Sequence, residues 1–218
     1  MEPAVLSSAE QRPRRVGARM TGARQRSVSR GQRIYAGNAS GTAWRVLSGS
    51  VRLDREEQPS GEQSFANLAV RGDVIGAETL LFGRYSFTAT ALADCVLVPW
   101  PDDRMPPAGD YSLLRTLAKA ERRAAEVIAL RCGQAADRVR RLVMMLAQAP
   151  AENPANQPQD LQVVLPSRQD MADITALTLE TVSRMVSQLR HAGLLAPLRQ
   201  GKHPSQRNFS VRPIASDS

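Results

Sequence analysis

Two neighbouring pieces of sequence carry the strongest structural signal in this chain: Leu165-Pro166-Ser167-Arg168-Gln169-Asp170-Met171-Ala172 and Thr178-Leu179-Glu180-Thr181-Val182-Ser183-Arg184. In the first, a hydroxyl at Ser167 and an acid at Asp170 are typical of a helix start, because together they can satisfy free N–H groups of the first turn. In the second, Thr178 can cap another helix, with Glu180 in its first turn, where the helix dipole favours an anion. Two short helices joined by so few residues predict a helix-turn-helix.

The outward face of the second predicted helix can read DNA bases. Arg184 can donate two parallel hydrogen bonds to guanine O6 and N7, and Glu180 can accept one from cytosine N4 while holding Arg184 at the i, i+4 spacing. We therefore predict base readout by Glu180, Ser183 and Arg184; the alternative is a surface ion pair between Glu180 and Arg184. Contacts with the DNA backbone are predicted near the two helix starts, at Ser167, Arg168, Gln169, Thr178 and Thr181.

A basic C-terminal region agrees with a nucleic-acid partner. The formal net charge is +8, of which residues 135–218 carry +3 while residues 31–134 are balanced. After Gly193, a basic loop with Arg199, Lys202 and Arg207 precedes the short strand Asn208–Val211, which predicts a wing whose tip can reach phosphates. Such a surface favours double-stranded DNA, although charge alone also fits a solvated face.

A long amphipathic helix is predicted upstream, because residues 111–148 contain no proline and a single glycine, Gly133, which marks a break. Its apolar row predicts pairing with a second copy of the chain; the alternative is packing against the N-terminal domain. Two alternative sets of residues can form this apolar row. One is Leu113, Leu117, Ala120, Ala124, Val127 and Arg131, and the other is Leu114, Leu117, Glu121, Ala124 and Ile128. The helix after the break has its own apolar stripe: Val139, Leu142, Val143 and Leu146.

Short apolar runs separated by turn formers fill residues 31–100, and about eight strands at this spacing predict a small β-barrel or jelly roll. The polar segment 54–64 predicts a hairpin loop. The predicted fold class is thus α+β. It has a β-barrel (jelly roll) over 30–104, a dimerisation helix over 110–133 and a winged helix-turn-helix over 135–214, after a disordered basic arm over 1–29.

Composition excludes other classes of protein. A hydrophobic content of 42% in 218 residues excludes wholesale disorder. No apolar run is long enough to span a bilayer and no signal peptide is recognisable, so we expect a cytoplasmic protein without membrane contact. Two cysteines, Cys95 and Cys132, cannot form a disulfide framework, and we expect both to be packed thiols.

Together these residues resemble the CRP/FNR family of bacterial transcription regulators. The turns Val46-Leu47-Ser48-Gly49-Ser50-Val51-Arg52-Leu53 and Gly72-Asp73-Val74-Ile75-Gly76-Ala77-Glu78 resemble those of the family's cyclic-nucleotide-binding-like barrel. The resemblance, over residues 30–212, implies a homodimer on a two-fold symmetric promoter site. Glu180, Ser183 and Arg184, with leucine at position 179, resemble the FNR-type reading head, which implies a half-site close to TTGAT. An activator is implied, with the loop 54–64 as a candidate contact for RNA polymerase.

The resemblance also places a candidate effector pocket at Glu78, Arg84 and Ser86. Cyclic-nucleotide binders of the family present Arg-Ser to the phosphate, whereas this chain has Tyr85 before Ser86, and Arg84 one place early points to the other face of a strand. Glu78 keeps the place of the ribose-contacting acid. We therefore expect a regulator that needs no effector and does not bind cyclic AMP; the alternative is a ligand-gated regulator with an unknown small molecule in the barrel.

No cofactor or metal is expected. The FNR-type iron–sulfur cluster needs several cysteines near the N-terminus, and residues 1–94 contain none. His191 and His203 both lie in the DNA-binding third, which disfavours haem and also a metal-dependent cupin-type enzyme. One departure from the family lies in the predicted turn: Ala176 stands where glycine is usual, and alanine at positive φ is strained.

Overall fold

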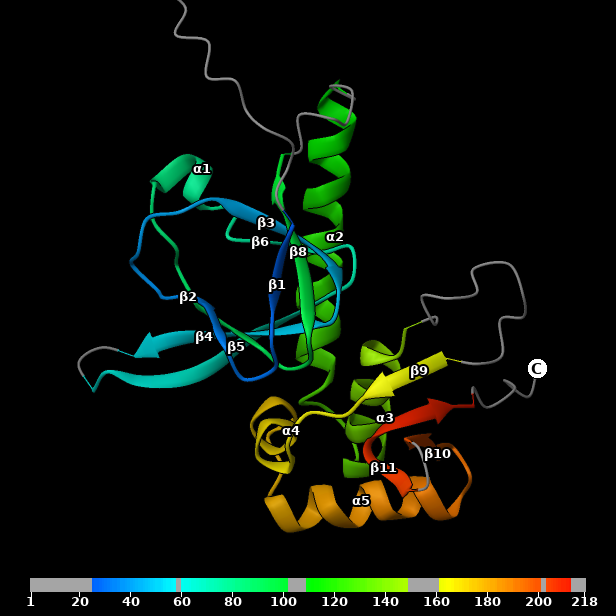
Figure 1. Ribbon diagram of the computed structural model, residues 1–218. Helices are drawn as coiled ribbons and strands as arrows, with labels where there is room; N and C mark the ends of the chain where they lie inside the picture. Colours follow the sequence, from blue (N-terminus) through cyan, green and yellow to red (C-terminus); the bar gives the residue numbers. More distant parts are fainter. Residues whose placement is uncertain (1–24, 58–59, 102–108, 149–160, 201–202, 213–218) are drawn as a thin grey trace, which may run out of the picture.

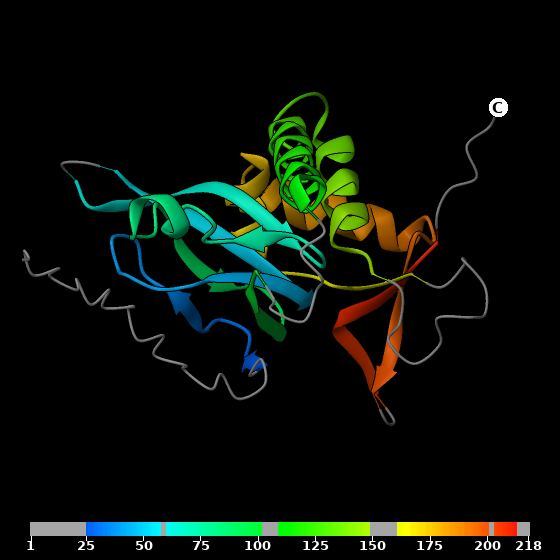
Figure 2. The ribbon, with the colours of Figure 1, turned by 90° about the horizontal axis from the view of Figure 1, so that it is seen from above.

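The computed structural model describes residues 25–57, 60–101, 109–148, 161–200 and 203–212. An N-terminal sandwich of strands lies beside one long helix, and a domain of three helices and three strands lies at the lower end of that helix (Figure 1). Seen from above, the C-terminal hairpin projects away from the helices (Figure 2). This mixture of helices and antiparallel sheets confirms the predicted α+β class.

Two four-stranded antiparallel sheets form the N-terminal sandwich, in the orders β1-β8-β3-β6 and β2-β7-β4-β5. Within the described residues neither sheet closes on itself, so the predicted β-barrel is an open, double-sheet jelly roll. A short helix, α1 (Thr79–Phe82), follows β6. The strands are β1 (Arg26–Val28), β2 (Arg33–Tyr35), β3 (Ala43–Ser48), β4 (Ser50–Glu57), β5 (Glu62–Val70), β6 (Val74–Ile75), β7 (Thr88–Ala91) and β8 (Cys95–Trp100).

The β4–β5 hairpin is longer than the sequence predicts. Residues 54–64 are expected to be a loop, but β4 continues to Glu57 and β5 begins at Glu62, and these two residues are paired. The expectation of a loop is therefore wrong for most of the segment. Residues 55–57 are polar and exposed on both faces of the ribbon, so they lack the apolar alternation that identifies a strand.

A short strand also lies inside the stretch predicted to be a disordered arm. β1 pairs antiparallel with β8, with Val28 opposite Cys95. Val28 is the one buried residue of the three, and so short a pattern does not identify a strand. Residues 1–24 of the predicted arm lie outside the described residues.

The long helix breaks where glycine predicts it. Helix α2 (Gly109–Ala129) and helix α3 (Ala135–Leu146) are separated by Gly133, which has a φ of 86°. The four apolar residues predicted for α3 are all buried. Leu113, Leu114, Leu117 and Ile128 of α2 are between 56% and 66% exposed, so these residues do not pack back on the sandwich, whereas Val127 is buried in a core that includes residues of β5. No helix in the described part of the chain is long and apolar enough to cross a membrane.

The C-terminal domain contains the predicted helix pair and a wing. The pair consists of α4 (Arg168–Thr175) and α5 (Leu179–His191), and the wing of β10 (Leu195–Gln200) and β11 (His203–Val211). A third strand, β9 (Leu161–Val164), pairs with β11 and is not predicted from the sequence. Residues 149–160, between α3 and β9, lie outside the described residues.

The two cysteines differ in accessibility. Cys95 is buried in β8 and donates its S–H to the carbonyl oxygens of Ser50 and Ala93. Cys132 is exposed after the end of α2, so the expectation of a packed thiol is wrong there. The bend between α2 and α3 leaves Cys132 outside the packed face of both helices.

We expect only Cys132 to react with a thiol reagent in the folded protein. Burial raises the pKa of Cys95 to about 11, so at pH 8 its thiol is both inaccessible and protonated, and only the thiolate is reactive. Titration with a chromogenic disulfide at pH 8 should give one fast thiol per chain and the second only after unfolding. Cys132→Ser should abolish the fast phase, and a fast phase that survives this change would contradict the assignment.

Candidate nucleic-acid interface

Both helices of the pair begin at the residues predicted to cap them. The Ser167 hydroxyl accepts a hydrogen bond from the backbone N–H of Asp170 at 3.0 Å, and the Asp170 carboxylate accepts one from the backbone N–H of Ser167 at 3.3 Å. This reciprocal pair is a capping box. At α5 the Thr178 hydroxyl accepts from the backbone N–H of Thr181 at 3.2 Å. The caps therefore set where both helices start.

The turn between the helices forces Ala176 into the left-handed region, with φ 51° and ψ 46°. The backbone N–H groups of Ala176 and Leu177 both donate to the carbonyl oxygen of Ala172, which closes the end of α4. Ile174 and Thr175, the two residues before Ala176, are fully buried. Burial of the neighbouring side chains thus offsets the strain of an alanine at positive φ.

Helix α5 presents one face to the domain and the other to solvent. Val182, Met185 and Val186 are buried, while Glu180 and Arg184 are exposed and Ser183 is half-buried. The ion pairs of the described residues do not include one between Glu180 and Arg184, so the expected i, i+4 pairing is absent. The two opposite charges stand on one exposed surface of the helix.

The residues predicted to contact a DNA backbone surround the two helix starts. Thr178 and Gln169 are exposed, although the Gln169 amide donates to Asp173 at 2.9 Å. Ser167, Arg168 and Thr181 are half-buried. All of them lie at the N-terminal turns of α4 and α5, where free N–H groups and hydroxyls suit an anion.

Arg168 is a half-buried cation close to another arginine. Burial, and secondly the nearby charge of Arg190, lower the pKa of Arg168 below its usual value. Its guanidinium lies 3.6 Å from the sulfur of Met171, and it is absent from the ion pairs of the described residues. A phosphate would relieve this unfavourable environment, because it supplies the counter-charge that the protein does not.

The candidate effector residues make two separate contacts within the sandwich. Glu78 accepts a hydrogen bond from the backbone N–H of Ser86 at 3.0 Å. Arg84 is exposed and donates to the carbonyl oxygen of Asn38 at 2.9 Å. The geometry therefore ties Glu78 to Ser86 but leaves Arg84 on a different contact.

Aromatic rings fill the sandwich beside these residues. Tyr85 is buried and stacks on Tyr35, with ring centroids 3.7 Å apart and an angle of 6° between the planes. The Tyr85 hydroxyl donates to the carbonyl oxygen of Thr42 at 2.7 Å. A Cβ atom at Gly76 would lie 2.6 Å from the Tyr85 ring, and one at Gly41 would clash with its hydroxyl. Both glycines thus leave room for Tyr85 itself.

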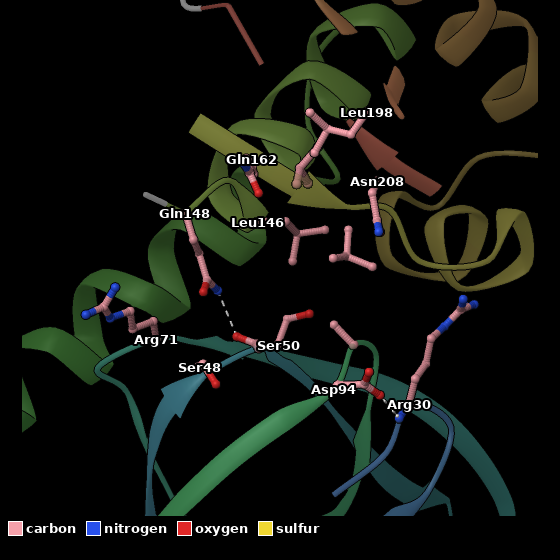
Figure 3. A pocket seen from close by; sticks show the side chains of 14 residues that line it. Arg30, Ser48, Ser50, Arg71, Asp94, Leu146, Gln148, Gln162, Leu198 and Asn208 are labelled. Carbon is pink, nitrogen blue, oxygen red and sulfur yellow. Dashed lines mark hydrogen bonds between the residues drawn. The ribbon is translucent and has the colours of Figure 1, made fainter. Parts of the chain in front are cut away.

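A cavity of about 360 Å³ lies elsewhere, between the sandwich and the C-terminal domain (Figure 3). The polar residues of its lining include Ser48 and Asp94 from the sandwich and Gln162 and Asn208 from the other domain. Gln148 spans the gap and donates its amide to the carbonyl oxygen of Gly49 at 2.8 Å. The described residues contain no group of three or more His, Cys, Asp or Glu side chains that could hold a metal ion.

Comparison with known proteins identifies the type of domain in both parts of the chain. Residues 25–106 match the family model of the cyclic nucleotide-binding domain, and residues 137–203 match that of the Crp-like helix-turn-helix domain. The transcriptional regulator LdrP of Thermus thermophilus is 31% identical over 170 residues, which cover 77% of this chain and 85% of LdrP. The chain belongs to the CRP/FNR family of transcription regulators.

Other relatives of this CRP/FNR regulator are also similar to it over most of its length. The nitrogen fixation regulation protein FixK of Rhizobium meliloti is 28% identical over 168 residues, which cover 76% of this chain and 75% of FixK. A CRP-family transcriptional regulator from Thermus thermophilus superposes with a TM-score of 0.62 at 25% identity, over 86% of this chain and 92% of the other. FixK2 of Bradyrhizobium japonicum shares the fold, with a TM-score of 0.62 at 23% identity, over 88% of this chain and 94% of its own.

This chain is therefore a DNA-binding transcription regulator and not an enzyme. The segment that matches the Crp-like domain model contains α4 and α5, the two capped helices described above. In a helix-turn-helix, the exposed face of the second helix is the one that contacts DNA, and α5 is the second helix here.

Proposed function

We propose that this regulator binds a two-fold symmetric, TTGAT-like DNA site as a homodimer and activates transcription without an effector. The observation that supports this most is the exposed face of α5, where Glu180, Ser183 and Arg184 are presented together without an internal ion pair. A guanidinium and a carboxylate that are not neutralised by each other remain available to guanine and cytosine edges. Such a protein acts in the cytoplasm, where the bacterial chromosome lies.

The dimer is supported by an apolar surface that the single chain leaves uncovered. Leu114 and Leu117 of α2 are each 56% exposed, and Leu81 and Phe82 of α1 are 83% and 74% exposed. A groove of about 510 Å³ with a largely apolar lining runs between α1 and α2. A second copy of α2 is its proposed occupant, because a two-fold axis along this helix buries the same surface in both chains.

The absence of an effector is supported by the contents of the sandwich. Tyr85 and Tyr35 occupy the interior beside the Glu78–Ser86 contact, and the Tyr85 hydroxyl has its hydrogen bond to the chain itself. A ligand there would have to displace a buried stacked pair. The β4–β5 hairpin, with exposed charges at Arg55 and Glu57, is the proposed contact for RNA polymerase.

Arg184→Ala should weaken binding to a TTGAT-N4-ATCAA duplex by about 1–3 kcal/mol and relax the preference for guanine, because it removes the donor pair for O6 and N7. Fluorescence anisotropy without any added ligand measures both effects. The matched control is Arg84→Ala, which removes the same charge from the sandwich surface and should leave the affinity unchanged. Equal wild-type affinity for a scrambled duplex would refute the proposed function.

Leu117→Glu should convert the dimer to a monomer, because it places a charge in the apolar surface between two α2 helices. Sedimentation velocity gives the mass of the variant, and Leu47→Glu, at another exposed leucine, is the control that should remain dimeric. A wild-type chain that sediments as a monomer at micromolar concentration contradicts the proposed dimer.

Calorimetric titration with cyclic AMP or cyclic di-GMP should show no binding, because the tyrosine pair fills the sandwich interior. The affinity for the two-fold duplex should be the same with and without either nucleotide. A nucleotide-dependent change in DNA affinity would instead favour the alternative, a ligand-gated regulator of the same fold.

A further inference from the structure

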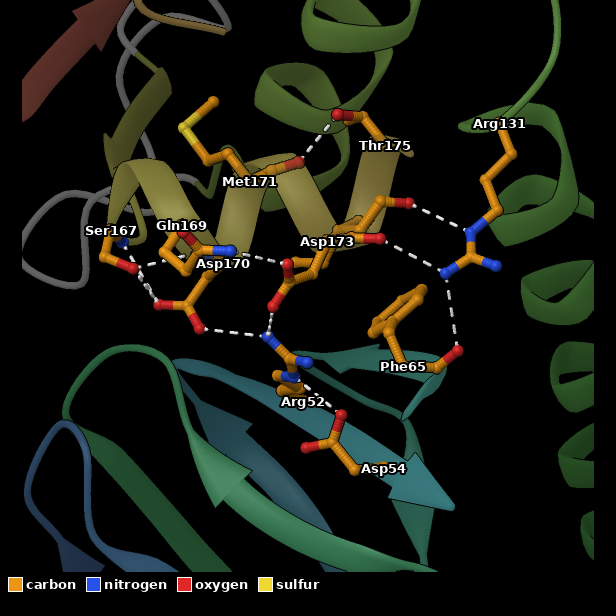
Figure 4. Close-up of polar contacts among 11 residues, drawn as sticks. Arg52, Asp54, Phe65, Arg131, Ser167, Gln169, Asp170, Met171, Asp173 and Thr175 are labelled. Carbon is orange, nitrogen blue, oxygen red and sulfur yellow. Dashed lines mark hydrogen bonds and ion pairs between the residues drawn. The ribbon is translucent and has the colours of Figure 1, made fainter. Parts of the chain in front are cut away.

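Arg52 of the sandwich contacts the first helix of the helix-turn-helix. Its Nε donates to Asp54 on the same strand at 2.7 Å, and its Nη1 donates to Asp173 at 2.9 Å and to Asp170 at 3.2 Å (Figure 4). Both of the latter carboxylates belong to α4. The Arg52 side chain is 13% exposed, so solvent and salt screen these ion pairs less than they screen surface pairs.

A second arginine contacts the same helix from the bend after α2. Arg131 Nη2 donates to the carbonyl oxygen of Asp173 at 3.2 Å, and its Nε lies 3.4 Å from that of Ile174. The last carbonyls of a helix carry partial negative charge, so a cation is favourable there. Arg52 therefore contacts acids along α4 while Arg131 contacts its C-terminal end.

The ring of Phe65, on β5, lies beside both arginines. The guanidinium carbon of Arg131 lies 5.2 Å from the ring centroid and that of Arg52 lies 5.9 Å from it. The carbonyl oxygen of Phe65 also accepts from Arg131 Nη2 at 3.4 Å. We name these six residues the Arg52 clasp: Arg52, Asp54, Phe65, Arg131, Asp170 and Asp173.

The charges of the clasp make Arg52 the residue on which the contact depends. Asp54 on the sandwich faces Asp170 and Asp173 on α4 across the domain boundary, and like charges there repel. Arg52 lies between them and reverses the sign of the interaction. Its removal would leave three carboxylates close together and partly buried, which is strongly unfavourable.

We propose that Arg52 is a positioning residue for DNA binding: it fixes the orientation of the helix-turn-helix relative to the sandwich, in place of a bound effector. This inference rests on the proposed function, a dimer on a two-fold site. The tight turn after α4 transmits the position of α4 to α5, because the N–H of Leu177 is held by the Ala172 carbonyl at 3.1 Å. In a dimer joined along α2, that orientation sets the distance between the two recognition helices.

The test compares DNA duplexes whose half-sites are separated by four or by six base pairs. Wild-type protein should prefer the four-base-pair spacer. Arg52→Ala should lower affinity for that duplex about tenfold or more and flatten the preference between spacers, because each helix-turn-helix then adopts many orientations. Arg52→Lys should lie between the two, because the three carboxylates contact two different nitrogens of Arg52 and a single ammonium nitrogen cannot occupy both positions.

Arg33→Ala is the matched control: it removes an exposed arginine from β2, in the same sheet as Arg52, and should change neither affinity nor spacer preference. A wild-type protein that discriminates spacers and an Arg52→Ala variant that does so equally would overturn the clasp while leaving the proposed function intact. A wild-type protein without preference for the two-fold site over scrambled DNA would instead overturn the proposed function.

Circular dichroism establishes whether Arg52→Ala folds. If it does not, Asp173→Asn is the variant that decides, because it removes one ion pair and one of the repelling charges without leaving a buried cation unpaired. It should weaken the spacer preference in the same direction as Arg52→Ala. A folded Asp173→Asn protein with the full wild-type preference overturns the clasp.

Discussion

One hydrophobic core crosses the boundary between the two domains, and the placement of the DNA-binding helices depends on it. Phe65, Leu68 and Val70 of β5 belong to the same buried cluster as Leu142 of α3 and Val186 of α5. The interior of the sandwich is a separate cluster. Because β5 contributes its outer face to the core of the C-terminal domain, that domain packs on the sandwich instead of being joined to it by a tether alone.

Apolar packing resists separation of the domains but is non-directional, so it leaves orientation to polar contacts at its edge. The Arg52 clasp supplies several of these polar contacts next to Phe65, at the edge of the shared core. The Gln148–Gly49 hydrogen bond supplies another polar contact, beside the cavity between the domains. The core holds the domains together, and the arginines select one arrangement.

Local signals predicted most of the elements, and their success has a physical reason. The caps at Ser167 and Thr178, the break at Gly133 and the buried stripe of α3 each depend on residues within a few positions of one another. The face of α5 is predictable for the same reason, since a helix repeats every 3.6 residues. The positive φ of Ala176 was instead implied by the resemblance, since glycine is usual at this turn in the family.

Contacts between distant segments could not be predicted from local signals. Arg52 lies 118 residues from Asp170 and 121 from Asp173, and nothing near it in the chain distinguishes it from Arg55, which makes no such contact. The length of the β4–β5 hairpin was missed because its outer residues are polar on both faces. The expected Glu180–Arg184 ion pair is absent for a different reason: the i, i+4 spacing permits an exposed ion pair but stabilises it little.

The sandwich interior filled by tyrosines and the Arg52 clasp complement each other. In a regulator gated by a ligand, binding energy at the sensor can shift the orientation of the DNA-binding domain. Here Tyr85 occupies the position beside Glu78 and Ser86. A side chain that is always present thus takes the place of a ligand and of its binding energy. Arg52 does the same at the domain boundary, where it supplies a permanent counter-charge to three carboxylates. Under the proposed function, a chain with both features needs no small molecule to set the orientation of α5, and we propose that its activity then depends on how much of the protein the cell contains.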